Sequence, residues 1–336
     1  MDPDAARRVG RAPHGGADDP GVIDFSANVN PLTPPGVETV YREALEAAQR
    51  YPPEPPEAFQ EAAAAYVGCD AERVVPTAGG LAAIRLAIET TVGPDDSVLV
   101  PAPSFAEYAR EVRLQGAEPA FVPHDELLAA DPAGHAMAIV CNPNNPTGDA
   151  YEDAALRDFA ARCRETGTTL LVDEAFLGFT DRPSLADEPG VVVARSLTKL
   201  FGLPGLRAGF AVAEGERLEA IAAARRPWNL GTPALRVGAH CLGQRDFVEA
   251  TRERVRSERG RMREALSERF DVHPSAAPFL LFDVGDREVA SVVDSVRERG
   301  IAIRDATTFR GLDDHVRVAV RLPGENDRLL EALADV

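Results

Sequence analysis

The chain has 336 residues and a formal net charge of −18, from 36 basic and 54 acidic side chains. Its hydrophobic content of 45 % predicts a substantial core rather than disorder. Acidic residues are spread along the whole chain, which disfavours binding to nucleic acid or to an anionic membrane surface. No apolar run approaches the ~20 residues that span a bilayer, and residues 1–19 lack the apolar centre of a secretion signal. We therefore expect a cytoplasmic protein.

Lysine occurs once among the 36 basic residues, at Lys199. An acidic chain with almost no lysine resembles halophilic proteins, in which concentrated salt screens the self-repulsion. A GC-rich genome that encodes arginine in place of lysine explains the same composition equally well. The four cysteines lie far apart without a CxxC pair, and the six histidines form no HxxxH or HxH pair. We expect reduced thiols and no metal site.

In chain order, residues 1–40 contain three closely spaced prolines and little regular pattern, which indicates an arm lying over another part of the structure or over a partner subunit. From residue 58, helix and strand patterns alternate. We expect helices at 58–67, 81–91, 105–115 and 154–165. We expect strands at 97–100, 118–122, 136–141, 169–172, 191–195 and 208–213. These strands are short, apolar and rich in Val, Leu and Ala, as in a largely parallel sheet that is buried on both faces.

The texture of the sequence changes near residue 234. Residues 236–270 are dense in Arg and Glu at three- and four-residue spacing, which predicts an exposed helix with ion pairs. Strands at 279–284, 301–304 and 315–320 then alternate with helices at 288–298 and 326–334. The pattern predicts an N-terminal arm at 1–40, a large domain at 41–235 and a smaller α+β domain at 236–336.

The clearest chemical signal is Ser196-Leu197-Thr198-Lys199, directly after the expected strand 191–195. Open α/β sheets bind ligands at such strand ends. A lysine amine can attack an aldehyde and form a Schiff base with it. The two hydroxyls, together with Arg207, suit a phosphate dianion nearby. A surface lysine in a turn is the ordinary interpretation, but this chain avoids lysine everywhere else.

Three further segments follow strands or open helices in the same way. Asp173 stands at the tip of an apolar strand, where a carboxylate needs a positive partner such as a protonated ring nitrogen; alone, it also suits a helix N-cap. The string Asn142-Pro143-Asn144-Asn145-Pro146-Thr147-Gly148 fixes a sharp turn that presents amide groups. Gly79-Gly80, before a predicted helix, leaves backbone amides free for an anion.

Together these segments supply an amine, a carboxylate and phosphate ligands, which are the parts of a pyridoxal phosphate site. The chain resembles fold-type I pyridoxal phosphate enzymes of the class I/II aminotransferase superfamily almost end to end. The resemblance implies a large α/β domain with a mostly parallel seven-stranded sheet, a smaller α+β C-terminal domain and an N-terminal arm. It also implies pyridoxal 5′-phosphate as cofactor.

Carried over position by position, the resemblance assigns covalent attachment of the cofactor to Lys199, pairing with the pyridine nitrogen to Asp173 and the ring-oxygen contact to Asn145. Phe105 would stack on the ring. Tyr51 would reach the phosphate site of a partner subunit, which implies a homodimer with shared sites. The cofactor phosphate would be held by Gly80, Leu81, Ser196, Thr198 and Arg207.

Two branches of the superfamily fit this chain: threonine-phosphate decarboxylases of cobalamin biosynthesis, and histidinol-phosphate aminotransferases. Phe176, where many aminotransferases have tyrosine, favours the decarboxylases. So do five strings taken together: 14–16, 24–31, 227–229, 304–305 with 309–312, and 316–321. A third possibility, a non-catalytic cofactor-binding protein, is disfavoured because no DNA-binding segment accompanies the scaffold.

Both activities act on an amino compound that carries a phosphate, so the site must hold a second dianion beyond the cofactor. The resemblance implies that Arg317 binds a substrate carboxylate through its two-pronged guanidinium. The remaining candidates for substrate contacts are Arg321, Arg304, Asn30 and His14. Of these, Arg321 is the preferred ligand for the substrate phosphate, and His14 ranks lowest.

Overall fold

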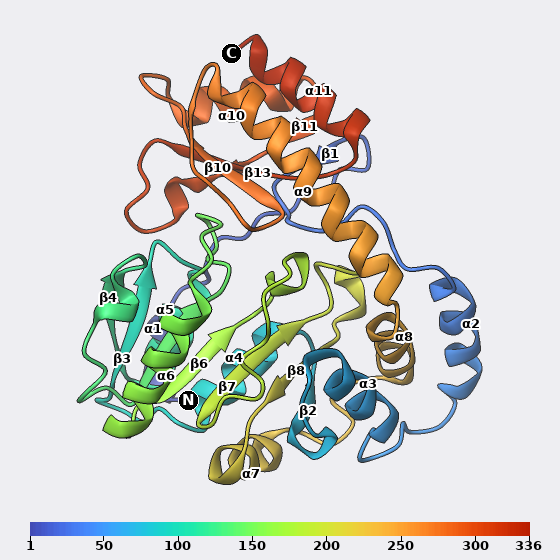
Figure 1. Ribbon diagram of the computed structural model, residues 1–336, viewed down its shortest axis with the longest axis vertical. Helices are drawn as coiled ribbons and strands as arrows, with labels where there is room; N and C mark the ends of the chain where they lie inside the picture. Colours follow the sequence, from blue (N-terminus) through green and yellow to red (C-terminus); the bar gives the residue numbers. More distant parts are fainter.

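The structure is a computed structural model that describes residues 1–336, and its larger lobe is built on a seven-stranded sheet (Figure 1). The strand order is β2-β8-β7-β6-β5-β3-β4. β8 runs antiparallel to β2 and β7, and all other neighbours are parallel. The strands are β2 (Val74–Thr77), β3 (Ser97–Ala102), β4 (Glu118–Pro123), β5 (Met137–Cys141), β6 (Thr169–Asp173), β7 (Val191–Ser196) and β8 (Gly209–Val212).

Helices cover both faces of this sheet, because its central strands are apolar on both sides. α8 packs against α2 and α3, whereas α4 packs against β7 and β8. The helices of the lobe are α2 (Val37–Ala47), α3 (Glu57–Val67), α4 (Gly80–Glu89), α5 (Glu107–Leu114), α6 (Asp153–Thr166), α7 (Gly215–Ala224) and α8 (Thr232–Leu242). Short 3₁₀ turns are η1 (Ala71–Arg73), η2 (Leu127–Ala129), η3 (Leu177–Phe179) and η4 (Pro204–Leu206).

The smaller lobe contains a four-stranded antiparallel sheet in the order β12-β13-β10-β9. The long helix α9 (Arg245–Ser267) runs from the large lobe into the small one (Figure 1) and packs against α11 and β10. The strands of this sheet are β9 (Asp271–Val272), β10 (Phe279–Asp283), β12 (Arg304–Asp305) and β13 (His315–Ala319). A further strand of this lobe, β11 (Ile301–Ala302), lies outside the sheet. The remaining helices are α10 (Val289–Glu298), α11 (Pro323–Ala334) and the turn η5 (Ala306–Thr308).

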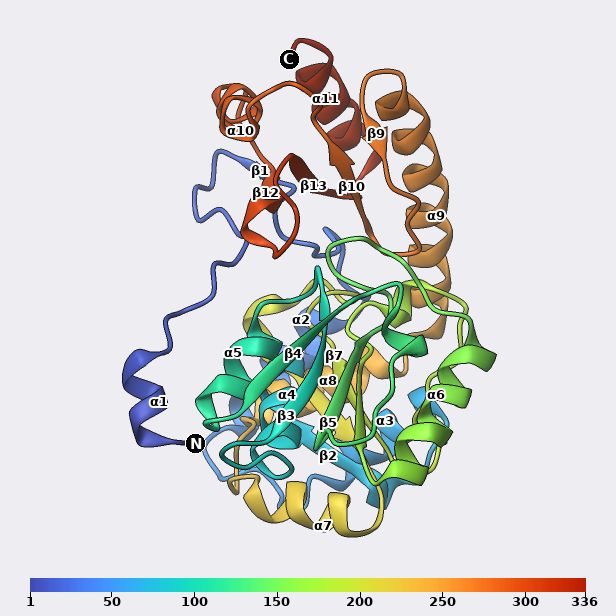
Figure 2. The same cartoon turned by 90° about the vertical axis from the view of Figure 1, so that its left-hand side faces the viewer.

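The predicted arm divides into several structured parts. α1 (Pro3–Arg8) packs against α5, and β1 (Ile23–Asp24) pairs in parallel with β11 of the small lobe. Figure 2 shows the extended segment between them climbing the side of the molecule from one lobe to the other. α2 then begins within the region where the sequence shows little regular pattern. Residues 1–40 therefore connect the two lobes.

Two further expectations differ from the structure. The single helix expected at 236–270 is two helices, α8 and α9, separated at Gly243 and Gln244. On α9 the expected i,i+3 ion pairs are confirmed, as in Arg256–Glu253 at 2.7 Å. The strand expected at 301–304 is split, because β11 pairs with the arm while β12 joins β13. No helix is both long and apolar enough to cross a membrane.

Candidate active site

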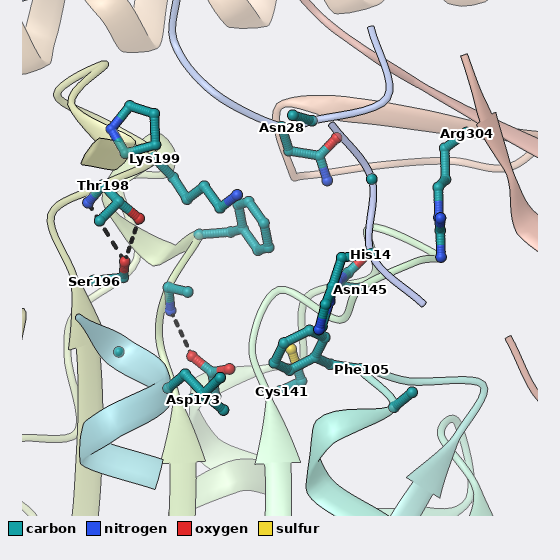
Figure 3. A pocket seen from close by; sticks show the side chains of 18 of the residues that line it. His14, Asn28, Phe105, Cys141, Asn145, Asp173, Ser196, Thr198, Lys199 and Arg304 are labelled. Atoms are coloured by element: carbon teal, nitrogen blue, oxygen red, sulfur yellow. Dashed lines mark hydrogen bonds between the residues drawn. The ribbon is translucent and has the colours of Figure 1, made fainter. Parts of the chain in front are cut away.

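A cavity of about 400 Å³ lies between the lobes, where β5, β6 and β7 end (Figure 3). Segments from the large lobe, the small lobe and the arm all contribute to its wall. Most of the residues assigned from the sequence meet here: Lys199, Asp173, Asn145, Ser196, Thr198, Gly80, Leu81, Phe105, Arg207, Arg317, Arg304 and His14. Tyr51, Arg321 and Asn30 do not line it.

Lys199 follows the end of β7 and reaches into the cavity (Figure 3). Burial of the ammonium group, with smaller contributions from the positive charges of Arg317 and Arg207, lowers the pKa of Lys199 to about 8. A neutral amine is therefore accessible near physiological pH, which is the state that attacks a carbonyl carbon. The environment that lowers the pKa also makes this lysine chemically reactive.

Asp173 ends β6 and lies below Lys199 in the same view (Figure 3). Its carboxylate accepts hydrogen bonds from Tyr108 Oη at 2.6 Å and from the Ala175 amide at 2.9 Å. Burial raises the pKa of Asp173, and these two hydrogen bonds oppose the shift. A positively charged ring nitrogen in the cavity would stabilise the ionised carboxylate much further.

A cradle for a phosphate group forms where α4 begins. The first amides of a helix have no acceptor within it, so those of Gly80 and Leu81 are available to an anion. A Cβ on Gly79, whose φ is +88°, would lie 2.5 Å from Arg207 Nη2, and one on Gly80 would lie 3.0 Å from Ser196 Cβ. Glycines thus let a guanidinium and a hydroxyl group approach the helix end closely.

Arg317 of β13 projects from the small lobe towards Asn145 of the large lobe, and its guanidinium hydrogen-bonds the Asn145 side-chain oxygen and the Ser26 carbonyl oxygen. Of the two buried arginines, Arg195 forms a salt bridge with Glu174 at 2.9 Å, but Arg317 meets no carboxylate. Its Nε is buried without a partner. Burial, and then the charge of Arg304, lower the pKa of Arg317 to about 9. A ligand carboxylate would pair with the charge of this guanidinium and accept the hydrogen bond that its Nε leaves unmade.

A second polar group lies on the far side of the cavity from Ser196 and Thr198 (Figure 3). It consists of Asn28, His14 and Arg304, and Asn28 was not selected from the sequence. Asn28 is only 3 % exposed, and its Oδ1 is buried without a hydrogen-bond partner. The signal was available, because Asn28 belongs to the string 24–31, from which only Asn30 was chosen.

The three assigned residues outside the cavity have other contacts. Arg321, preferred from the sequence as the phosphate ligand, instead forms an ion pair with Glu325 at 3.0 Å. Asn30 is buried, and its side chain donates to the Leu200 carbonyl oxygen at 2.8 Å. Tyr51 is 79 % exposed and packs against Trp228, with ring centroids 4.6 Å apart and the ring planes tilted by 31°. The side chains of Arg321 and Asn30 therefore stabilise the fold and do not line the cavity, whereas Tyr51 projects into solvent.

The chain belongs to the aminotransferase class I and II family, whose model matches residues 20–333. Family membership confirms three predictions from the sequence: the superfamily, the α/β fold with its large mostly parallel sheet, and pyridoxal 5′-phosphate as cofactor. The cradle at α4, Lys199 and Asp173 fit that cofactor. Family members are generally homodimers that act on small molecules.

Relatives with two different names are similar to this chain. A histidinol-phosphate aminotransferase of Symbiobacterium thermophilum is 33 % identical over 326 residues, which cover 93 % of this chain and 90 % of that protein. A threonine-phosphate decarboxylase of Salmonella typhimurium is 32 % identical over 336 residues, covering 94 % and 91 %. The crystal structure of histidinol-phosphate aminotransferase from Clostridium acetobutylicum superimposes with a TM-score of 0.85 at 25 % identity, covering 94 % and 98 %.

Proposed function

We propose that this protein decarboxylates L-threonine O-3-phosphate to (R)-1-amino-2-propanol O-2-phosphate, a step of cobalamin biosynthesis in the cytoplasm. The observation that carries the proposal is that His14 and Phe176, two of the sequence features that favour the decarboxylases, both line the cavity, His14 beside Asn28 and Arg304. His14 opens the string 14–16, one of the five that favour the decarboxylase branch. The group of three lies apart from the Ser196–Thr198 side of the cavity, so it suits a second phosphate.

Bound pyridoxal phosphate would supply an electron-accepting ring for the electron pair that departing carbon dioxide leaves on Cα. Lys199 would hold the cofactor, Asp173 its ring nitrogen, Asn145 its ring oxygen and Phe105 its face. The phosphate would bind Gly80, Leu81, Ser196, Thr198 and Arg207. Lys199 would be released when the substrate amine takes its place on the cofactor, and its ammonium group would give a proton to Cα once carbon dioxide has left, which completes the exchange of carboxylate for hydrogen.

Arg317 would hold the substrate carboxylate before the bond breaks. Its cation lies against the rings of Phe279 and Phe309, with the guanidinium carbon 5.2 Å and 5.6 Å from their centroids. The two rings limit the access of water to the guanidinium, so Arg317 would hold and orient the carboxylate until it leaves as neutral carbon dioxide. Phe176 packs edge-on against Phe279 at 5.2 Å and adds another apolar wall without a hydroxyl group.

Transamination of histidinol phosphate with 2-oxoglutarate is the second candidate, because relatives of both names are about equally similar to this chain. That substrate also carries an amine and a phosphate, so Asn28, His14 and Arg304 would suit it too. It lacks the carboxylate that decarboxylation requires at Cα.

We also propose that the protein is a homodimer in which Tyr51 completes the cofactor phosphate site of the partner. Exposed aromatic side chains such as Tyr51 and Trp228 mark interaction surfaces. Glu54 accepts hydrogen bonds from Arg225 and from the Trp228 amide, which fixes this projecting segment. Sedimentation analysis of the wild-type protein tests the dimer, and Tyr51→Phe should weaken phosphate-dependent retention of the cofactor.

The deciding experiment incubates the cofactor-loaded protein with L-threonine O-3-phosphate and measures carbon dioxide. A parallel incubation with histidinol phosphate and 2-oxoglutarate measures glutamate. Carbon dioxide without glutamate supports decarboxylation, and glutamate without carbon dioxide supports the aminotransferase. A visible cofactor absorbance with neither product would identify a non-catalytic cofactor-binding protein.

A further inference from the structure

Residues 10–17 of the arm are fastened to both lobes at the mouth of the cavity. Arg110 of α5 donates to the Gly10 carbonyl oxygen at 2.9 Å, and Arg304 of β12 donates to the Pro13 carbonyl oxygen at 3.1 Å. On the far side of His14, the Gly16 amide donates to Ser26 Oγ at 2.8 Å. The imidazole is therefore carried by a backbone that is held on both sides.

Two glycines after His14 make this course of the backbone possible. A Cβ on Gly15 would collide with the Ser26 carbonyl oxygen, and Gly16 has a φ of +129°, which other residues rarely adopt. The string His14-Gly15-Gly16 thus has a physical meaning beyond resemblance: the glycines let the arm turn against the segment around Ser26 while the imidazole enters the cavity wall.

The imidazole itself meets a buried carboxylate. His14 Nε2 lies 3.0 Å from Glu107 Oε1, and Glu107 is only 3 % exposed in the first turn of α5. The other oxygen, Oε2, accepts a hydrogen bond from Arg110 at 3.2 Å. Because a carboxylate accepts hydrogen bonds, Nε2 carries a proton here; a phosphate dianion also only accepts, so Nδ1 carries a proton too when the ring binds one. A protonated ring would donate to Glu107 and to the ligand at once.

We infer that Glu107 is a positioning residue that acts through His14 and fixes the imidazole for recognition of the substrate's phosphate. The inference rests on the proposed function, because it needs a phosphorylated substrate in this cavity. Orienting the imidazole before the substrate arrives lowers the entropic cost of binding. Glu107 sits beside Phe105 and Tyr108 in the sequence but reaches the site only through the arm.

The test compares Glu107→Gln with Glu111→Gln in the cofactor-loaded enzyme. Glu111 lies one turn further along α5, is equally buried and contacts the same Arg110 at 3.0 Å, but does not touch His14. Burial already raises the pKa of Glu111, so a neutral replacement is mild there. We expect Glu107→Gln to raise the KM for L-threonine O-3-phosphate about tenfold or more, with kcat within threefold. Glu111→Gln should leave KM within twofold.

A double-mutant cycle identifies the route of the effect. If Glu107 acts through His14, then His14→Ala combined with Glu107→Gln has the KM of His14→Ala alone. Effects on KM that multiply, or an unchanged KM in Glu107→Gln, would overturn the inference. Should Glu107→Gln fail to fold, Glu107→Asp takes its place: it keeps the charge but withdraws the carboxylate from His14 Nε2 by one methylene group, and a KM that stays unchanged there counts against the inference equally.

Two readouts separate this inference from the proposed decarboxylation. The KM series is repeated with histidinol phosphate, so that a Glu107 effect seen only with that substrate would refute the decarboxylase and keep the inference. Amide hydrogen exchange of residues 10–16 is measured without any substrate. We expect faster exchange in Glu107→Gln and wild-type exchange in Glu111→Gln, and equal exchange in the two variants would contradict the role of Glu107.

Discussion

The two sides of the cavity are built in different ways. The cofactor side consists of residues at the ends of β5, β6 and β7 and at the start of α4, all carried by one sheet. The substrate side joins the arm, the segment around Asn28 and the small lobe, which meet only through tertiary contacts such as that between Arg304 and Pro13. The residues that would bind the cofactor therefore sit on a single sheet, whereas selectivity for the substrate depends on how the lobes and the arm come together.

The largest expected effect is on the cofactor side, at Lys199. Lys199→Ala removes the only amine side chain of the protein and should lower kcat by at least about a thousandfold, with loss of the visible absorbance of bound cofactor. Lys199→Arg is the matched control, because a guanidinium stays protonated and cannot replace the amine. If Lys199→Ala kept the visible absorbance of bound cofactor, Lys199 would not be the residue that attaches the cofactor.

Asp173 should have the next largest effect. Asp173→Asn keeps the shape but removes the charge that would face the ring nitrogen, and we expect kcat to fall about a hundredfold. Tyr108→Phe removes only the 2.6 Å hydrogen bond to that carboxylate, so its kcat should fall tenfold or less. Steady-state kinetics of the two variants gives the comparison, and similar losses in both would mean that the charge of Asp173 is not what matters.

Moderate effects are expected on the substrate side. Asn28→Ala and Arg304→Gln should raise the KM for a phosphorylated substrate about ten- to a hundredfold, without changing the cofactor spectrum. Matched variants Asn30→Ala and Arg321→Gln lie outside the cavity. They should lower the unfolding temperature, since they break contacts to Leu200 and Glu325, and leave KM nearly unchanged. If Asn30→Ala and Arg321→Gln raised KM while Asn28→Ala did not, then Asn30 and Arg321, chosen from the sequence, would contact the substrate in place of Asn28.

The low pKa of Lys199 predicts a pH dependence for cofactor capture. Only the neutral amine reacts, so the rate at which cofactor-free protein takes up pyridoxal phosphate should rise about tenfold per pH unit below 8 and level off above it. Arg317→Gln removes a positive charge that favours the neutral amine and should move the midpoint to higher pH. Stopped-flow absorbance measures both curves, and a midpoint near that of free lysine would contradict the effect of burial.

The smallest effect concerns the surface rather than either side of the cavity. With a net charge of −18, the folded protein repels itself, so added salt should raise its thermal unfolding midpoint. A midpoint that does not respond to salt would favour the compositional explanation, in which the genome simply encodes arginine for lysine.

Much of the large lobe could be predicted because its strands are continuous apolar runs bounded by turns. β5, β6 and β7 lie within one residue of the expected bounds at each end. α2 was not predicted, although Val37, Val40, Tyr41, Ala44 and Leu45 recur at the three- and four-residue spacing of an amphipathic helix. Tyr41 and Leu45 of that apolar face are exposed in the chain. The strand expected at 301–304 could not be divided from sequence, since the division depends on β1, which is distant along the chain.

The cofactor side of the cavity could be predicted without a structure. Asp173 ends β6, and Lys199 and Asn145 come within four residues of the ends of β7 and β5, so the sheet brings them together whatever the rest of the chain does. The single lysine stands at a position where arginine could not replace it, because a guanidinium stays protonated and does not form a Schiff base. On the substrate side, Arg317, Arg304 and His14 were predicted from the sequence and line the cavity, but the choice between Asn28 and Asn30 came only from the fold. At Asn28 the backbone makes a tight turn, in which the Val29 amide donates to the Ala27 carbonyl oxygen at 2.8 Å. Asn28 lines the cavity, whereas Asn30 donates to the Leu200 carbonyl oxygen in the core. Which side chain enters a shared cavity depends on contacts between distant segments, and these form only when the chain has folded.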